Sequence, residues 1–154
     1  MNRRKLREHI FKLVFTIIDK YLPEENIIYY FEDNKIEEDA DEIKAVTMGV
    51  VNNLHTIDSV ILEHTKGYTF ARISKVCLAV MRVAIYEILF LDSVPNSVAI
   101  SEAMEIASKY EDEKSKAFVN GVLGAFVKSL TKDAEENGQD VAAPQTENGE
   151  QDSE

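Results

Sequence analysis

Residues 76–91 read VCLAVMRVAIYEILFL, and they are the clearest indication of how the chain folds. Only Arg82 and Glu87 in this stretch carry a charge, and its apolar side chains cover every face of a helix. A helix that is apolar all round lies buried at the centre of a globular protein. We therefore predict a central helix over about 69–91, in which both charges must find partners because unpaired buried charges are costly.

Further helices are predicted on the C-terminal side. The sequence DSVP at 92–95 breaks the central helix, and Pro95 suits a first helical turn. Apolar residues at helical spacing predict one helix over 96–110 and a last one over 114–130. A stripe of small residues on the last helix consists of Ala117, Gly121 and Gly124. Because glycine costs a helix about 1 kcal/mol relative to alanine, we expect this stripe to meet another helix closely.

The N-terminal side predicts a helix over 3–21, a short one over 25–32 and a long segment over 36–66. Apolar side chains on one face of the first helix are Leu6, Ile10, Leu13, Ile17 and Tyr21. The long segment is one bent helix or two, interrupted at Gly49 or at Asn52-Asn53. Gly67 is expected to end it as a left-handed cap.

These patterns predict an all-α protein with a single helical domain of about six or seven helices over residues 1–131. A chain of 154 residues is long enough to bury the core of one such domain. Residues 132–154 differ in composition, because eight acidic residues and one lysine follow Thr131 in a chain of net charge −11. With almost no apolar periodicity, this acidic tail is predicted to be disordered.

Several classes of protein are excluded by the composition. The single cysteine rules out an intramolecular disulfide framework and indicates a reducing, cytoplasmic setting. No stretch approaches the roughly 20 apolar residues of a membrane-spanning helix. His9 and Lys12 interrupt the apolar run that a secretory signal peptide would need. We expect a cytoplasmic protein that does not bind a membrane.

Patterns for catalysis and metal binding are not found either. His9, His55 and His64 lack the spacing of a zinc-binding helix, and Cys77 in its apolar run is predicted to be an inert core thiol. No glycine-rich phosphate loop or dinucleotide fingerprint occurs. The sequence indicates a binding protein without catalytic residues, metal or cofactor, rather than an enzyme.

The chain opens with a basic cluster. Residues 2–15 read NRRKLREHIFKLVF, which places four cations within little more than one helical turn. Guanidinium groups match phosphate oxygens bidentately, whereas the helix dipole disfavours cations at this end. On a helical wheel Arg4, Phe11 and Phe15 lie at the edge of the apolar face. Rings beside cations suit single-stranded RNA, whose unstacked bases can lie on aromatic side chains.

The spacing alone leaves three interpretations of this start open. The first and commonest arrangement is a solvated basic turn with ordinary core aromatics. The second interpretation is an RNA-binding site, and the third is a membrane-surface helix. The acidic tail has two interpretations as well. It is a solvating segment, or it competes with RNA for the basic start.

Two later stretches carry a family resemblance. Residues 81–110 read MRVAIYEILFLDSVPNSVAISEAMEIASKY, and residues 112–123 read DEKSKAFVNGVL. In this order they resemble the bacterial transcription antitermination factor NusB family, whose arginine-rich start is similar to RRKLRE…LVF here. The resemblance covers about residues 3–130, is weak over 24–70 and leaves out the acidic tail.

This resemblance implies a fold, a ligand and partners. The fold would be all-helical, with an N-terminal helical part packed on a C-terminal helical bundle. The ligand would be the boxA element of nascent ribosomal RNA, bound together with NusE, a small-subunit ribosomal protein. The complex would help RNA polymerase pass termination sites. The alternative from another class is an all-helical protein–protein adaptor, as a homodimer that buries its basic helix and has no specific RNA target.

The resemblance also implies an RNA-binding surface of cations and rings. Its members are Arg3, Arg4, Lys5, Arg7, Phe15, Tyr110, Lys114 and Phe118. Core packing is an equal alternative for Phe118, and the amide of Asn120 is expected to tie helices together. Gly124 stands where many family members have an acidic residue, and the stretch 72–77 carries fewer charges than expected. No residue is therefore assigned to NusE.

Overall fold

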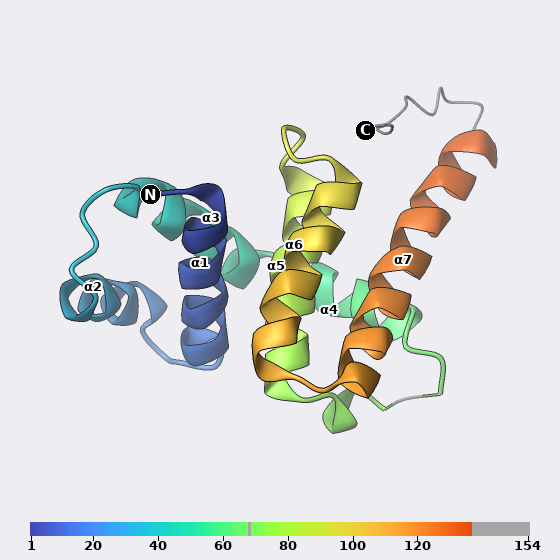
Figure 1. Ribbon diagram of the computed structural model, residues 1–154, viewed down its shortest axis with the longest axis horizontal. Coiled ribbons are helices and arrows are strands. Elements are labelled where there is room, and N and C mark those ends of the chain that lie inside the picture. Colours follow the sequence, from blue (N-terminus) through green and yellow to red (C-terminus); the bar gives the residue numbers. More distant parts are fainter. Residues whose placement is uncertain (68, 137–154) are drawn as a thin grey trace.

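The computed structural model describes residues 1–67 and 69–136, and within them it contains seven α-helices, one 3-10 turn and no strand. This confirms the all-α prediction. The elements are α1 (Arg3–Ile17), α2 (Pro23–Asp33), α3 (Ala40–Asn52), α4 (Leu54–Glu63), η1 (Phe70–Arg72), α5 (Lys75–Phe90), α6 (Asn96–Tyr110) and α7 (Glu113–Glu136) (Figure 1).

Helix α5 is the central helix that residues 76–91 predicted. It packs against α1, α3, α4, α6 and α7, and its buried side chains lie on all of its faces. The Ser74 side chain caps it by accepting a hydrogen bond from the backbone N–H of Cys77 at 3.0 Å. Its two buried charged residues have found the partners that burial requires: Arg82 donates to Asp58 at 2.8 Å, and Glu87 accepts from Arg7.

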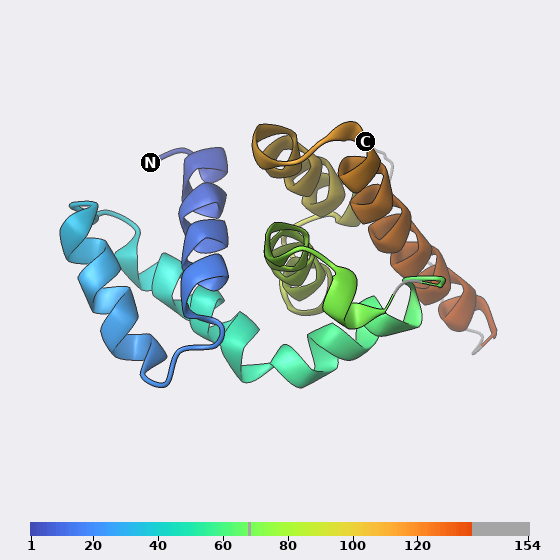
Figure 2. The same ribbon diagram turned by 90° about the horizontal axis from the view of Figure 1, so that it is seen from below.

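The molecule has an N-terminal part made of α1, α2 and α3, which packs on a bundle that includes α5, α6 and α7 (Figures 1 and 2). Helix α1 joins the two parts because it contacts both α3 and α5. Its predicted core residues Leu6, Ile10, Leu13 and Ile17 are all buried. Tyr21 was wrongly included among them, because α1 ends at Ile17 and Tyr21 is 95% exposed.

The segment predicted as one bent helix or two is two helices, α3 and α4. The break falls at Asn53, whose side chain donates a hydrogen bond to the carbonyl oxygen of Gly49 at 2.7 Å. Gly49 itself lies inside α3, where a Cβ atom would overlap the ring of Tyr86 on α5. This glycine allows two helices to approach each other and does not interrupt the helix.

The predicted ends of the other helices differ from the structure by a few residues. Gly67 has a φ of +83°, as a left-handed residue should, although α4 already ends at Glu63. Helix α5 begins at Lys75 rather than at residue 69, because the 3-10 turn η1 occupies part of the space between. Helix α7 continues to Glu136, which is five residues into the predicted tail. Residues 137–154 lie outside the described part of the chain, so their predicted disorder is untested.

The small-residue stripe of α7 does not meet another helix, contrary to expectation. Ala117 and Gly121 are exposed, and a Cβ atom added at Gly121 or Gly124 would have no neighbour within 4 Å. The core-facing side of α7 consists instead of Val119, Val122, Leu123 and Phe126. The small residues of α7 therefore lie on its outer side and do not form a helix–helix contact.

Candidate functional site

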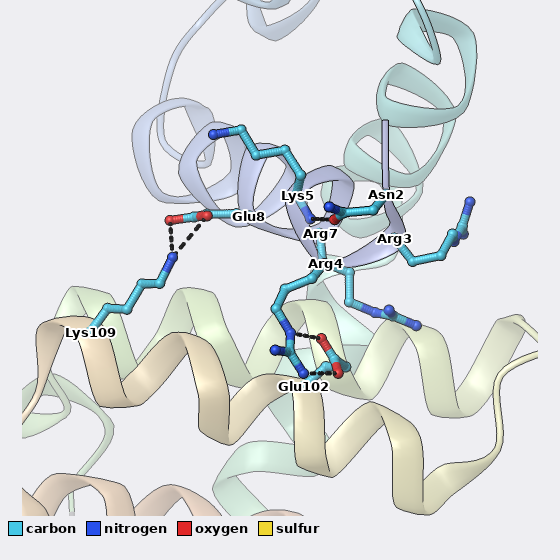
Figure 3. Close-up of a pocket in the computed structure, with 8 residues that line it drawn as sticks. All are labelled: Asn2, Arg3, Arg4, Lys5, Arg7, Glu8, Glu102 and Lys109. Carbon is cyan, nitrogen blue, oxygen red and sulfur yellow. Dashed lines mark hydrogen bonds and ion pairs between the residues drawn. The ribbon is translucent and has the colours of Figure 1, made fainter.

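The first turn of α1 is fixed by a side-chain cap. The Asn2 side chain accepts a hydrogen bond from the backbone N–H of Lys5 at 2.8 Å. No acidic residue lies in this turn, so its cations stand at the positive end of the helix dipole. They line an open cavity of about 550 Å³ between α1 and α6, together with Glu8, Glu102 and Lys109 (Figure 3).

The guanidinium groups of Arg3 and Arg4 each hold a carboxylate from another helix. Arg3 donates two hydrogen bonds to Glu42 of α3, at 3.0 and 2.7 Å. Arg4 donates two to Glu102 of α6, at 3.1 and 3.0 Å (Figure 3). Hydrogen bonds from these arginines lower the pKa of both carboxyl groups. Both arginine side chains remain more than half exposed, at 58% and 59%.

Arg7 has a different environment from the other cations of the cluster. Its Nε donates to the two carboxylate oxygens of Glu87 at 3.0 and 3.3 Å, and both side chains are buried. Burial raises the pKa of Glu87, although the attraction and hydrogen bond of Arg7 oppose this. Arg7 therefore connects α1 to the central helix α5 from inside the protein.

Lysines and acidic residues continue the same surface. Lys109 of α6 donates to both carboxylate oxygens of Glu8 at 3.1 and 3.0 Å, which lowers the pKa of Glu8. The Tyr110 hydroxyl also donates to Glu8, at 3.4 Å. The Lys5 side chain is exposed, makes no ion pair among the described residues and points away from Glu102 (Figure 3).

Aromatic rings form a strip beside these cations. The ring centroid of Phe11 lies 6.4 Å from that of Phe15 and 5.4 Å from that of Tyr110. Phe15 and Tyr110 are 39% and 45% exposed, whereas Phe11 is buried between them. The helical wheel predicted Phe11 at the edge of the apolar face of α1, but Tyr110 at the end of α6 covers the Phe11 ring. The structure thus brings residues of α1 and α6 together in one aromatic strip.

The predicted residues on α7 lie in its first two turns, shortly after Tyr110 in the sequence. Lys114 is exposed, and Phe118 is half-buried in the lining of a second cavity, of about 200 Å³, which also includes Arg72. Asn120 is exposed and makes no hydrogen bond through its side chain within the described residues. The expectation that its amide ties helices together is therefore wrong.

Sequence reasoning missed the carboxylates that hold the arginines and the cation at the second cavity. Glu102 lies inside the quoted stretch AISEAMEIA, which could have drawn attention to it as a partner for a cation. Glu42 and Arg72 gave no such signal, because their partners and cavity depend on how helices distant in sequence pack.

Metal-binding clusters and membrane-spanning helices are not found among the described residues. No three histidine, cysteine, aspartate or glutamate side chains among them come together in a way that could hold a metal ion. Within the same residues, none of the helices has the length and apolar character needed to cross a membrane. Cys77 is buried, and desolvation raises the pKa of its thiol, as expected of a core cysteine.

Known proteins share both the sequence and the fold. A protein-family model described as the NusB family matches residues 4–128. The transcription antitermination protein NusB of Clostridium acetobutylicum is 41% identical over 131 residues, which make up 84% of this chain and 97% of that relative.

Solved structures agree with this match. A structure of NusB from T. maritima has a TM-score of 0.72 at 31% identity, and the match covers 88% of this chain and 98% of that one. A crystal structure of antitermination factors NusB and NusE in complex with dsRNA has a TM-score of 0.73 at 26% identity, covering 82% and 96% of the two chains.

Proposed function

This chain belongs to the NusB family, and on that premise we propose that it is an RNA-binding transcription antitermination factor. It binds the boxA element of nascent ribosomal RNA together with NusE and helps RNA polymerase pass terminators. Relatives named for antitermination and a solved complex of NusB and NusE with dsRNA support this proposal. We further propose that it acts in the cytoplasm as a binding protein and catalyses no reaction.

The observation that carries the proposal is the aromatic strip of Phe15, Phe11 and Tyr110 beside the cations of α1 and α6. Its outer rings are exposed, and Lys109 directly precedes Tyr110 in the sequence. Lys5 and Lys109 both line the cavity between α1 and α6. Aromatic rings offer stacking surfaces to unpaired bases, while lysine and arginine hold the phosphates between them. This combination favours a single-stranded ligand.

RNA phosphates must compete with carboxylates for the arginines. The pairs of Arg3 with Glu42 and Arg4 with Glu102 are solvent-exposed on the arginine side, and such surface pairs contribute little to stability. Phosphate can therefore replace the carboxylate at little cost. If Arg7 bound a phosphate instead of Glu87, the buried charge of Glu87 would have no partner. The free-energy cost of that exchange is far higher. We propose that Arg3, Arg4 and Lys5 contact RNA and that Arg7 holds their helix in place.

A binding titration over a range of salt concentrations tests the proposal. Its ligands are boxA RNA, a scrambled strand and a boxA duplex, each with and without NusE. We expect preference for single-stranded boxA, stronger with NusE. The double variant Arg4→Ala/Lys5→Ala should bind more weakly, and each lost phosphate contact should lower the salt slope by about 0.7.

The control variant Lys44→Ala/Lys128→Ala removes the same charge from surfaces away from the aromatic strip. Its binding should stay close to that of the unchanged protein. Equal binding of boxA and scrambled RNA, both with and without NusE, would contradict the proposed function while leaving the fold unaffected.

A second candidate function has one observation in its favour. Large apolar side chains are exposed around α2 and the turn before it, namely Tyr21, Leu22, Ile28 and Tyr29. Such a patch is typical of a contact with another protein, as the adaptor alternative requires. Light scattering tests this: a stable dimer whose mass does not change with RNA would favour an adaptor over an RNA-binding factor.

A further inference from the structure

A groove lies between the start of α6 and the last turns of α7, at the upper end of the bundle in Figure 1. It has a volume of about 450 Å³, and its lining includes Ile100 of α6 and Gly124, Val127, Lys128, Lys132 and Glu135 of α7. A Cβ atom added at Gly124 would have no neighbour within 4 Å, so no other described part of the chain covers this glycine. The groove therefore has room for a further segment.

The lining combines apolar side chains with cations. Ile100 and Val127 are half-buried, whereas Lys128 and Lys132 are exposed. Neither lysine side chain makes an ion pair or hydrogen bond within residues 1–67 and 69–136. They stand one helical turn apart, about 6 Å along the axis, so one carboxylate can bind both. Glu135 is the one acidic residue of the lining, and the groove keeps a net positive charge.

The chain itself contains a segment of complementary composition. Residues 140–147 read DVAAPQTE. Asp140 directly precedes Val141, Ala142 and Ala143, which are the only aliphatic residues after Glu136. One carboxylate beside a short aliphatic run matches two lysines beside an apolar floor.

This segment is also close enough to the groove along the chain. Helix α7 ends at Glu136, next to the groove residue Glu135. The dipeptide Asn137-Gly138, which is typical of turns, follows directly. Ala143 comes seven residues after Glu136, and an extended chain of that length spans up to about 24 Å. Val127 lies nine residues before Glu136, which is only about 14 Å along the helix.

We propose that the groove between α6 and α7 binds residues 140–143 of the same chain. The aliphatic side chains lie against Ile100 and Val127, over Gly124, and the Asp140 carboxylate binds Lys128 and Lys132. The inference does not rest on RNA binding. It gives part of the acidic tail a binding site on the helical body.

Carbodiimide cross-linking, which joins a carboxylate to an amine in contact with it, tests this in the full-length chain at low salt. The tail carries the same charge whether bound or not, so the protein is measured without RNA. Peptide mass spectrometry should find Asp140 linked to Lys128 or Lys132 within one monomer. Gly124→Glu fills the groove and repels the carboxylate, so the yield should fall about threefold. Gly121→Glu is the matched control, because it adds the same charge one turn away, outside the groove.

Amide NMR signals of the full-length chain give a second measurement. Val141→Gln replaces an aliphatic side chain of the bound segment by a polar one, so it should shift the signals of Ile100 and Gly124. Thr146→Gln changes the tail outside this segment and should leave both signals in place.

Three results would overturn the proposal. Links found only between two monomers would mean that the groove binds the tail of a second copy. Equal yields in Gly124→Glu and Gly121→Glu would mean that the tail meets the lysines without entering the groove. Unchanged signals of Ile100 and Gly124 in Val141→Gln would mean that the aliphatic run does not bind there. Each result leaves the proposed function standing, because none of them measures RNA binding.

Discussion

Arg4 and Glu102 hold each other through two hydrogen bonds, so an RNA phosphate reaches Arg4 only by displacing a carboxylate. Glu102→Gln removes the competing charge and keeps the side-chain shape. We expect boxA affinity at low salt to rise by about twofold to fivefold, the range of a surface ion pair. Glu105→Gln is the control on the same helix, since its carboxylate lies 3.9 Å from Arg4. An equal rise in both variants would mean that net charge, rather than this pair, limits binding.

A pH dependence is expected from His9, which is buried against Tyr30. Burial, together with Lys5 and Lys12, lowers the pKa of His9 below its ordinary 6.5. Burial raises the pKa of Tyr30 to about 12. The Tyr30 hydroxyl therefore stays protonated. It can donate a hydrogen bond to His9 Nδ1, 2.8 Å away, only while that nitrogen carries no proton.

Because the folded pKa of His9 is depressed, its contribution to stability is complete above pH 6.5 and is lost as the pH falls through the folded value. The free energy of unfolding, measured by denaturant titration, should decrease from pH 7 towards pH 5. His9→Gln should flatten this decrease. His55→Gln, which changes an exposed histidine, should not. An unchanged slope in His9→Gln would refute the assignment.

The basic residues of the candidate site were predictable from sequence, but their carboxylate partners were not. Arg3 and Glu42 are 39 residues apart, and Arg4 and Glu102 are 98 apart. Such pairs form only once α1 has packed between α3 and α6. Local spacing likewise could not distinguish Arg7, which turns inward, from Arg4, which lies one turn away and stays exposed.

At the scale of the helices, two glycines of similar appearance should respond in opposite ways to alanine. Gly49→Ala would press a Cβ atom into the ring of Tyr86, so we expect it to lower the free energy of unfolding by about 1–3 kcal/mol. In Gly121→Ala the added Cβ atom has no neighbour within 4 Å, so we expect the free energy of unfolding to rise by about 0.5–1 kcal/mol. Denaturant unfolding of both variants measures the two changes. A loss of stability in Gly121→Ala would mean that the outer face of α7 is covered.

Helix positions followed from sequence because apolar spacing reflects the core directly. The buried positions of α1 and α5 were predicted in this way. The roles of Gly49 and Gly121 were not, because a glycine looks the same in sequence whether it faces a neighbouring ring or solvent. Only the packing of α3 on α5 distinguishes the two.

For the molecule as a whole, charge is unevenly divided between the helical body and the acidic tail. Residues 137–154 contain five acidic and no basic side chains, in a chain whose net charge is −11. The proposed RNA surface lies on the body, where most of its arginines already hold carboxylates. Additional negative charge on the same chain therefore opposes RNA by repulsion and by competition for the remaining cations.

A chain that ends at Glu136 should consequently bind RNA more tightly at low salt than the full chain. The difference should shrink as salt rises, because the Debye length falls from about 30 Å at 0.01 M to about 10 Å at 0.1 M. It should affect boxA and scrambled RNA alike, since repulsion does not read sequence. Replacing the five acidic residues by their amides keeps the length of the tail and should reproduce the effect. Equal affinities of all three proteins at low salt would show that the tail takes no part in RNA binding.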